Sequence, residues 1–107
     1  MRLPFPLVAF AILGTATTAV ASSDDAWKEF AATVEQKCLA AAGDMLDAPE
    51  AVVDPFGSAR FGLAIVTGKA KGTDTMASHI CVLDKQSETV EIGSELSAEQ
   101  VRIKADK

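Results

Sequence analysis

The two cysteines of the chain lie in segments with different periodicities, and this restricts the folds that the chain can adopt. Cys38 falls in residues 22–43, where apolar side chains recur every three or four residues, as on one face of an α-helix. The residues of this face are Trp27, Phe30, Ala31, Val34, Cys38 and Ala41. Gly43 is a typical helix end. Cys81 falls in residues 76–84, which are rich in apolar and β-branched side chains and therefore predict a strand.

The first 21 residues have the three parts of a cleavable secretory signal. Arg2 supplies a positive charge, residues 7–13 are apolar, and small side chains at Ala19 and Ala21 precede the predicted cut. The apolar stretch is short, whereas a membrane-spanning helix needs about 20 mostly apolar residues. We therefore expect a leader at 1–21 and a single small domain at 22–107. The domain is expected to be exported to the bacterial periplasm or secreted, without stable membrane insertion after cleavage.

An exported chain meets an oxidising compartment, where paired cysteines form disulfides. Loss of residues 1–21 leaves 86 of the 107 residues, and a domain of this size has a small core that benefits from a covalent link. A helix packed on a sheet can bring Cys38 and Cys81 within the Cα separation of about 7 Å that a disulfide tolerates. We predict a Cys38–Cys81 disulfide between the helix and the sheet.

The segments after the helix predict strands separated by turns. The predicted strands are residues 60–69, 76–84 and 89–96. Residues 44–60 are expected to form a connection, because Pro49 and Pro55 interrupt regular structure. Within this connection, residues 51–54 are a candidate for a short edge strand.

The C-terminal segment has three possible structures: a fourth strand, a frayed tail at 101–107, or a helical turn that begins at 97–100. Residues 101–107 alternate between polar and apolar side chains as a fourth strand would, but residues 97–100 could instead begin a helical turn. The predicted fold class is α+β in every case. One N-terminal amphipathic helix packs on a three- to four-stranded antiparallel meander.

His79 is the only histidine and lies two residues before Cys81, so both side chains share one strand face. A zinc site needs further ligands, and a disulfide-bonded Cys81 cannot be one of them. Catalysis would need a nucleophile tied to this histidine, and no motif supplies one. We expect a partly buried, hydrogen-bonded His79, with a metal-binding or pH-sensing role as the less favoured alternative. No cofactor and no enzymatic activity are predicted.

The charge of the chain narrows its possible partners. The net charge is −5 at pH 7, and loss of residues 1–21 removes one of ten basic residues and none of fifteen acidic ones, which gives −6. A negative charge disfavours nucleic acid and anionic membranes as partners. It suits a basic exported protein, although acidity also serves solubility alone.

The small size, the disulfide and the lack of catalytic motifs favour a non-enzymatic module that binds a protein, as an inhibitor or accessory subunit. Loops present side chains without disturbing a core, so Lys69, Lys71 and Asp74 are candidate contacts. Trp27 is a candidate anchor if its ring is exposed. The alternative is a carrier of a small ligand or metal, because a helix over a curved sheet can leave a pocket. An enzyme with a site shared between two subunits is the least favoured function.

Overall fold

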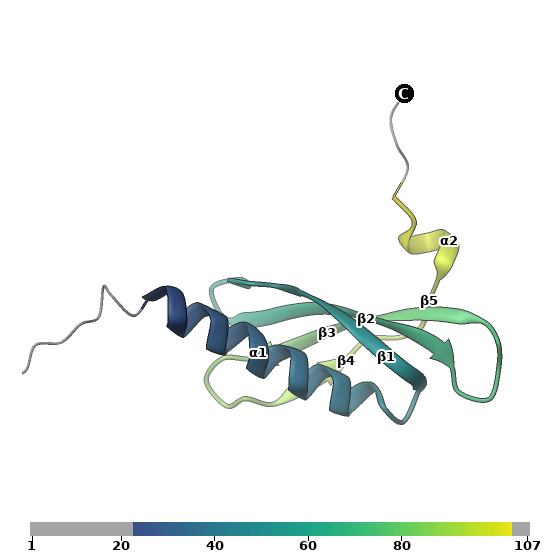
Figure 1. The fold of residues 1–107 in the computed structure, drawn as a ribbon, viewed down its shortest axis with the longest axis horizontal. Coiled ribbons are helices and arrows are strands. Elements are labelled where there is room, and N and C mark those ends of the chain that lie inside the picture. The colour runs from purple at the N-terminus through teal and green to yellow at the C-terminus, as the bar shows by residue number, and fades with distance from the viewer. Residues whose placement is uncertain (1–22, 104–107) are drawn as a thin grey trace, which may run out of the picture.

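A computed structural model describes residues 23–103; the predicted leader at 1–21 and residues 104–107 lie outside the described part. The chain begins with the helix α1 and continues into a sheet (Figure 1). The elements in order are α1 (Ser23–Ala42), β1 (Leu46–Asp54), β2 (Phe61–Ala70), β3 (Met76–Asp84), β4 (Val90–Ile92), β5 (Leu96–Ser97) and α2 (Ala98–Val101).

All strand pairs of the sheet are antiparallel. The strand order is β1-β2-β3-β4, and β5 pairs with β3 further along the same edge as β4. The helix α1 lies along the sheet, whereas α2 stands at the end of the sheet away from the start of α1 (Figure 1). The prediction of an α+β fold with a helix on an antiparallel sheet is therefore confirmed. The sheet has five strands rather than three or four.

The prediction of a connection at 44–60 is wrong for most of its length, because residues 46–54 form β1. The candidate edge strand at 51–54 is confirmed as the second part of β1, which lies at the sheet edge. Pro49 is accommodated at an irregularity in the pairing of β1 with β2, where the register shifts between Asp47 and Glu50. Ala48 has a φ of 48° at the same place. Because β1 is an edge strand and pairs on one side only, a proline can occupy it without removing a hydrogen bond from the ladder.

The predicted strand at 89–96 is divided into β4 and β5 by residues 93–95. The N–H of Gly93 donates to the carbonyl of Ile80 at 2.7 Å, so the chain stays attached to β3 across the interruption. The predicted fourth strand at 101–107 is wrong within the described residues, because Val101 ends the helical turn α2.

The helical alternative at 97–100 is confirmed by the way in which α2 begins. The side chain of Ser97 accepts a hydrogen bond from the N–H of Gln100, and the side chain of Gln100 accepts one from the N–H of Ser97. This reciprocal capping box satisfies two backbone donors that a helix start otherwise leaves without a partner.

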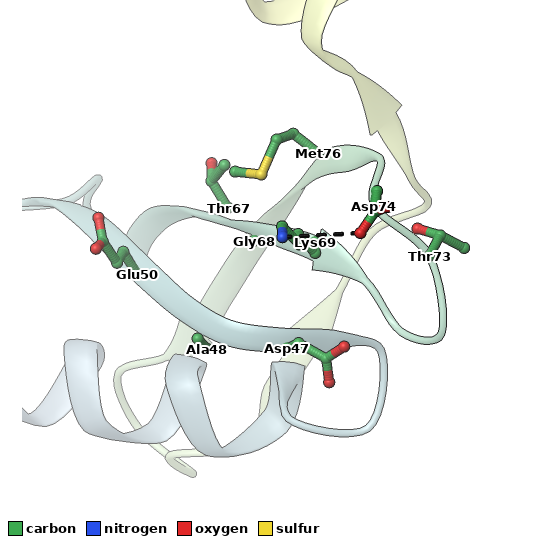
Figure 2. A pocket seen from close by; sticks show the side chains of 9 residues that line it. All are labelled: Asp47, Ala48, Glu50, Thr67, Gly68, Lys69, Thr73, Asp74 and Met76. Carbon is green, nitrogen blue, oxygen red and sulfur yellow. Dashed lines mark ion pairs between the residues drawn. The ribbon is translucent and has the colours of Figure 1, made fainter.

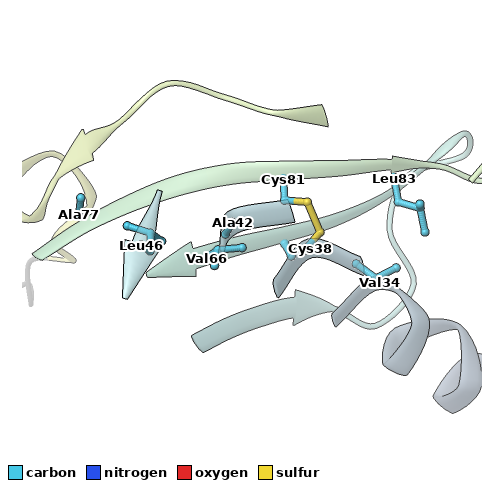
Figure 3. Close-up of a cluster of buried hydrophobic side chains, with 9 residues drawn as sticks. Val34, Cys38, Ala42, Leu46, Val66, Ala77, Cys81 and Leu83 are labelled. Carbon is cyan, nitrogen blue, oxygen red and sulfur yellow. A yellow bond between two sulfur atoms is a disulfide. The ribbon is translucent and has the colours of Figure 1, made fainter. Parts of the chain in front are cut away.

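The core lies between α1 and the face of the sheet that meets it (Figure 3). Its buried residues are Val34, Cys38, Ala42, Leu46, Ala64, Val66, Ala77, Cys81 and Leu83. Gly62 permits close approach of the helix, because a Cβ atom there would lie only 2.6 Å from Cγ2 of Val34. No helix among the described residues is long and apolar enough to cross a membrane.

Candidate functional site

The two cysteines form the predicted disulfide between α1 and β3, with a Cα–Cα distance of 6.0 Å (Figure 3). Both side chains are completely buried in the core. The bond removes both sulfurs from nucleophilic and metal-ligand chemistry, because that chemistry requires a free thiolate. The role of Cys38 and Cys81 is therefore to fasten the helix to a central strand.

His79 is buried, with 6% of its surface exposed. Its Nδ1 atom lies 2.8 Å from the carbonyl oxygen of Gly93, in the segment between β4 and β5. A carbonyl oxygen can only accept, so Nδ1 carries the proton and donates. The expected hydrogen bond is present, and the side chain is more deeply buried than the sequence predicts. The bond holds the interrupted edge against β3. Within residues 23–103, no group of three or more His, Cys, Asp and Glu side chains is placed to hold a metal ion.

The three loop residues Lys69, Lys71 and Asp74 lie at one end of the sheet but do not point to one place. Nζ of Lys69 lies 3.9 Å from Oδ1 of Asp74, across the hairpin between β2 and β3 (Figure 2). Lys71 turns toward the end of α1, where its Nζ donates to the carbonyl of Gly43 at 2.6 Å. Lys71 therefore ties the hairpin to the helix end, and the other two residues face a surface hollow.

This hollow has a volume of about 580 Å³ and opens to solvent (Figure 2). It is lined by Asp47, Ala48, Glu50, Thr67, Gly68, Lys69, Thr73, Asp74 and Met76. The hollow is wide open to solvent, whereas a site for a small ligand usually encloses most of the ligand's surface. The hollow is thus a weak candidate for a ligand pocket.

Trp27 packs in an aromatic cluster at the start of α1. Its ring meets Phe30 edge-on at 5.9 Å and Phe56 at 5.0 Å. Nζ of Lys85 lies 5.5 Å from the Trp27 ring and also donates to the carbonyls of Phe56 and Ser58. With 38% of its surface exposed, Trp27 fixes the loop between β1 and β2 and still presents part of its ring to solvent.

Two aspartates have a lowered pKa for a reason that is local to their turns. Backbone N–H groups of Gly57 and Phe56 donate to Asp54, and this lowers the pKa of its carboxyl group. Asp84 accepts in the same way in the turn after β3, and its pKa is lowered too. Hydrogen bonds to a carboxylate favour its charged form. Both groups therefore stabilise turns rather than forming an acid–base pair.

One side of the sheet points away from α1 and carries exposed aliphatic side chains. In β2 the buried residues Ala64 and Val66 face the helix, so Leu63 and Ile65 point to the other side. The strand register places Val52, Ile65 and Ile80 side by side across β1, β2 and β3. Their exposed fractions are 75%, 43% and 50%.

The neighbouring row on the same side contains Leu63 beside Val82, and both are half-buried. We call these five side chains the open face: Val52, Leu63, Ile65, Ile80 and Val82. Among the described residues, α1 packs on the opposite side, and the main contacts of α2 are with β3 and β5 at one corner. Figure 1 accordingly shows α1 along one side of the long strands and α2 beyond their end.

The open face is not among the predicted sites, although the sequence contains one signal for it. Residues 61–66 are apolar at consecutive positions, which is typical of a strand covered on both sides. The fold supplies a cover for one side only. The apolar residues of the second side are therefore left without a cover among residues 23–103.

Comparison with known proteins gives no relative for this chain. No protein-family model, no curated protein and no solved structure matches it.

Proposed function

We propose that this chain is an exported, non-enzymatic interaction module that holds a protein partner against its open face. The observation that carries the proposal is the row of exposed aliphatic side chains formed by Val52, Ile65 and Ile80 on three adjacent strands. Contiguous exposed apolar patches that are bordered by polar residues are typical of interaction sites.

The scaffold behind the open face suits this role. The disulfide and the buried core hold β2 and β3 against α1, so the exposed row is presented on regular strands rather than on a mobile loop. Surfaces that are already ordered before binding lose less conformational entropy when the partner binds. The predicted leader supports an exported location, in which the disulfide would be stable.

The experiment places a photo-crosslinking amino acid at Ile80 in the full chain, expressed in cells that naturally make it. The matched control carries the same group at Ala32, which is exposed on α1 on the other side of the molecule. We expect a covalent adduct with another protein from position 80 and none from position 32. A second substitution, Ile65→Lys, should abolish the adduct.

The outcomes separate the alternatives. Equal adducts from both positions, or none from position 80 in cells where the protein is abundant, would refute the open face as the binding site. Retention of the disulfide and of the thermal melt must be checked for each variant, so that loss of the adduct is not a consequence of unfolding.

The alternative function, a carrier of a small ligand, rests on the hollow beside Lys69 and Asp74. It predicts bound mass in a non-denaturing mass spectrum of the purified protein. It also predicts that Asp74→Ala removes this mass, whereas Ile80→Lys does not.

A further inference from the structure

The open face has acidic side chains at three of its four corners. On β1, Glu50 and Asp54 flank Val52 on the same side of the strand, since residues two apart share a face. On β4, Glu91 pairs with Val82 and therefore points to the same side. The fourth corner is formed by Leu96 of β5, which pairs with Ser78.

The positive charges nearest to the open face are those of Lys85, Lys69 and Arg60. Lys85 is close enough to Asp54 to help lower its pKa, but its Nζ is held by the carbonyls of Phe56 and Ser58 beside the rings of α1. Lys69 and Arg60 lie beyond the two ends of the patch, and each has an acidic neighbour. Lys69 is at the hairpin end of β2, beside Asp74. Arg60 precedes β2 at the other end, where its charge helps to lower the pKa of Asp84. The patch itself is therefore apolar at its centre and negative at its border.

This arrangement disfavours a second copy of the chain as the occupant. In a symmetric dimer, each copy offers the same surface to the other. If two copies pack with the centres of their open faces together, each corner of one copy faces a corner of the other. The corner at Leu96 is the only one of the four without an acidic side chain. At most one of the acids Glu50, Asp54 and Glu91 can face that corner, so at least two must face an acidic side chain of the second copy. Like charges opposed in this way are unfavourable.

We infer that the partner on the open face is a basic protein surface, with aliphatic side chains at its centre and lysine or arginine side chains at its border. This inference rests on the proposed function and adds the chemistry of the partner to it. Glu50 and Asp54 are four residues apart along one strand, which corresponds to about 13 Å. Glu91 is on β4, three strands from β1, which corresponds to about 14 Å across the sheet. The partner's positive groups would need a similar spacing around its apolar centre.

The test uses two synthetic peptides as probes, Lys-Lys-Gly-Leu-Val-Leu-Gly-Lys-Lys and the twin with glutamate at every lysine. Binding to the purified protein is followed in two-dimensional amide spectra at low and high salt. We expect the lysine peptide to shift the amide signals around Ile65 and Ile80, and the glutamate peptide to leave them unchanged. The effect should weaken as salt rises, because the border charges are exposed and are screened.

Two double variants test whether the border charges contribute to binding. Glu50→Gln with Glu91→Gln removes two border charges and should weaken binding of the lysine peptide roughly three- to tenfold at low salt. The matched control, Glu29→Gln with Glu35→Gln, makes the same change of charge on α1 and should leave binding unchanged.

Failure of the inference and failure of the proposed function give different results. If Ile80→Lys abolishes binding but both peptides bind equally to the unmodified protein, the open face is a binding site without charge preference and the inference is wrong. If the shifts map to α1 instead, both proposals fail. If sedimentation shows a dimer that Ile80→Lys converts to a monomer, the occupant is a second copy and the inference is again wrong.

Discussion

Removal of the disulfide should cost this protein a large part of its stability. The variant is Cys38→Ala with Cys81→Ala, because alanine leaves no hydroxyl group in a core where both cysteines are completely buried. The two residues are 43 positions apart in the chain. For a loop of that length, the chain-entropy model gives a loss of about 4 kcal/mol at 25 °C. A domain of this size has a total free energy of unfolding of about 4–12 kcal/mol.

Urea and thermal unfolding followed by circular dichroism measure this loss. The thermal midpoint of the variant should fall by at least about 15 °C relative to the oxidised protein. The dependence of the free energy on urea should become steeper, because an unfolded chain without the cross-link exposes more surface. Reductant should destabilise the unmodified protein by a similar amount and should not affect the variant.

A second variant separates loop closure from packing. Cys38→Ser with Cys81→Ser breaks the same bond but also buries two hydroxyl groups, each of which costs about 1–3 kcal/mol if it finds no partner. The serine variant should therefore be less stable than the alanine variant. If the alanine variant stays within about 1 kcal/mol of the oxidised protein, the entropic account of this disulfide is refuted.

Three further predictions follow from the core, the turns and the buried histidine. Gly62→Ala should lower the free energy of unfolding by about 1–3 kcal/mol in urea melts, because the added Cβ collides with α1. Gly93→Ala places its Cβ at ordinary contact distances, so it should lower this free energy by less than half as much. Asp54 and Asp84 have a lower pKa in the folded than in the unfolded state, so their stabilisation is present above about pH 4 and is lost as the pH falls through the folded value. Replacing both with alanine should make the urea midpoint depend less on pH below about pH 4. An unchanged dependence would show that the two carboxylates do not stabilise their turns. In the neutral ring of His79, nitrogen NMR should find the proton on Nδ1, and the opposite tautomer would show that the bond to the Gly93 carbonyl is not formed.

The sequence was sufficient for the elements whose pattern reflects burial. The helix spacing around Val34 and Cys38 and the apolar strands around Val66 and Cys81 all describe one core, and the disulfide follows from their positions in it. The sequence predicts only residues 51–54 of β1, as a candidate edge strand, because a proline such as Pro49 usually interrupts regular structure. Its tolerance depends on a tertiary fact, the position of β1 at the sheet edge, which no local pattern contains.

The candidate site was less predictable than the fold for a similar reason. Lys69, Lys71 and Asp74 are exposed and charged, so the sequence singles them out, yet Lys71 is bonded to the carbonyl of Gly43 on a distant segment. Ile65 and Ile80 look like core residues in the sequence. An aliphatic side chain on a strand is buried only if another part of the chain packs on that side of the sheet. Whether a second layer packs there depends on the whole fold and cannot be inferred from the strand alone.

The strand order also has a consequence for how the chain folds. Every long strand pairs with the strand before or after it in the sequence, so the sheet can be assembled from successive hairpins. Such local pairing is associated with fast folding. In a reduced chain these hairpins can form before α1 docks on β3. In an oxidised chain Cys38 and Cys81 are already joined, so α1 is held near β3 while the strands are still unpaired. The redox state at the moment of folding therefore sets the order in which helix and sheet meet.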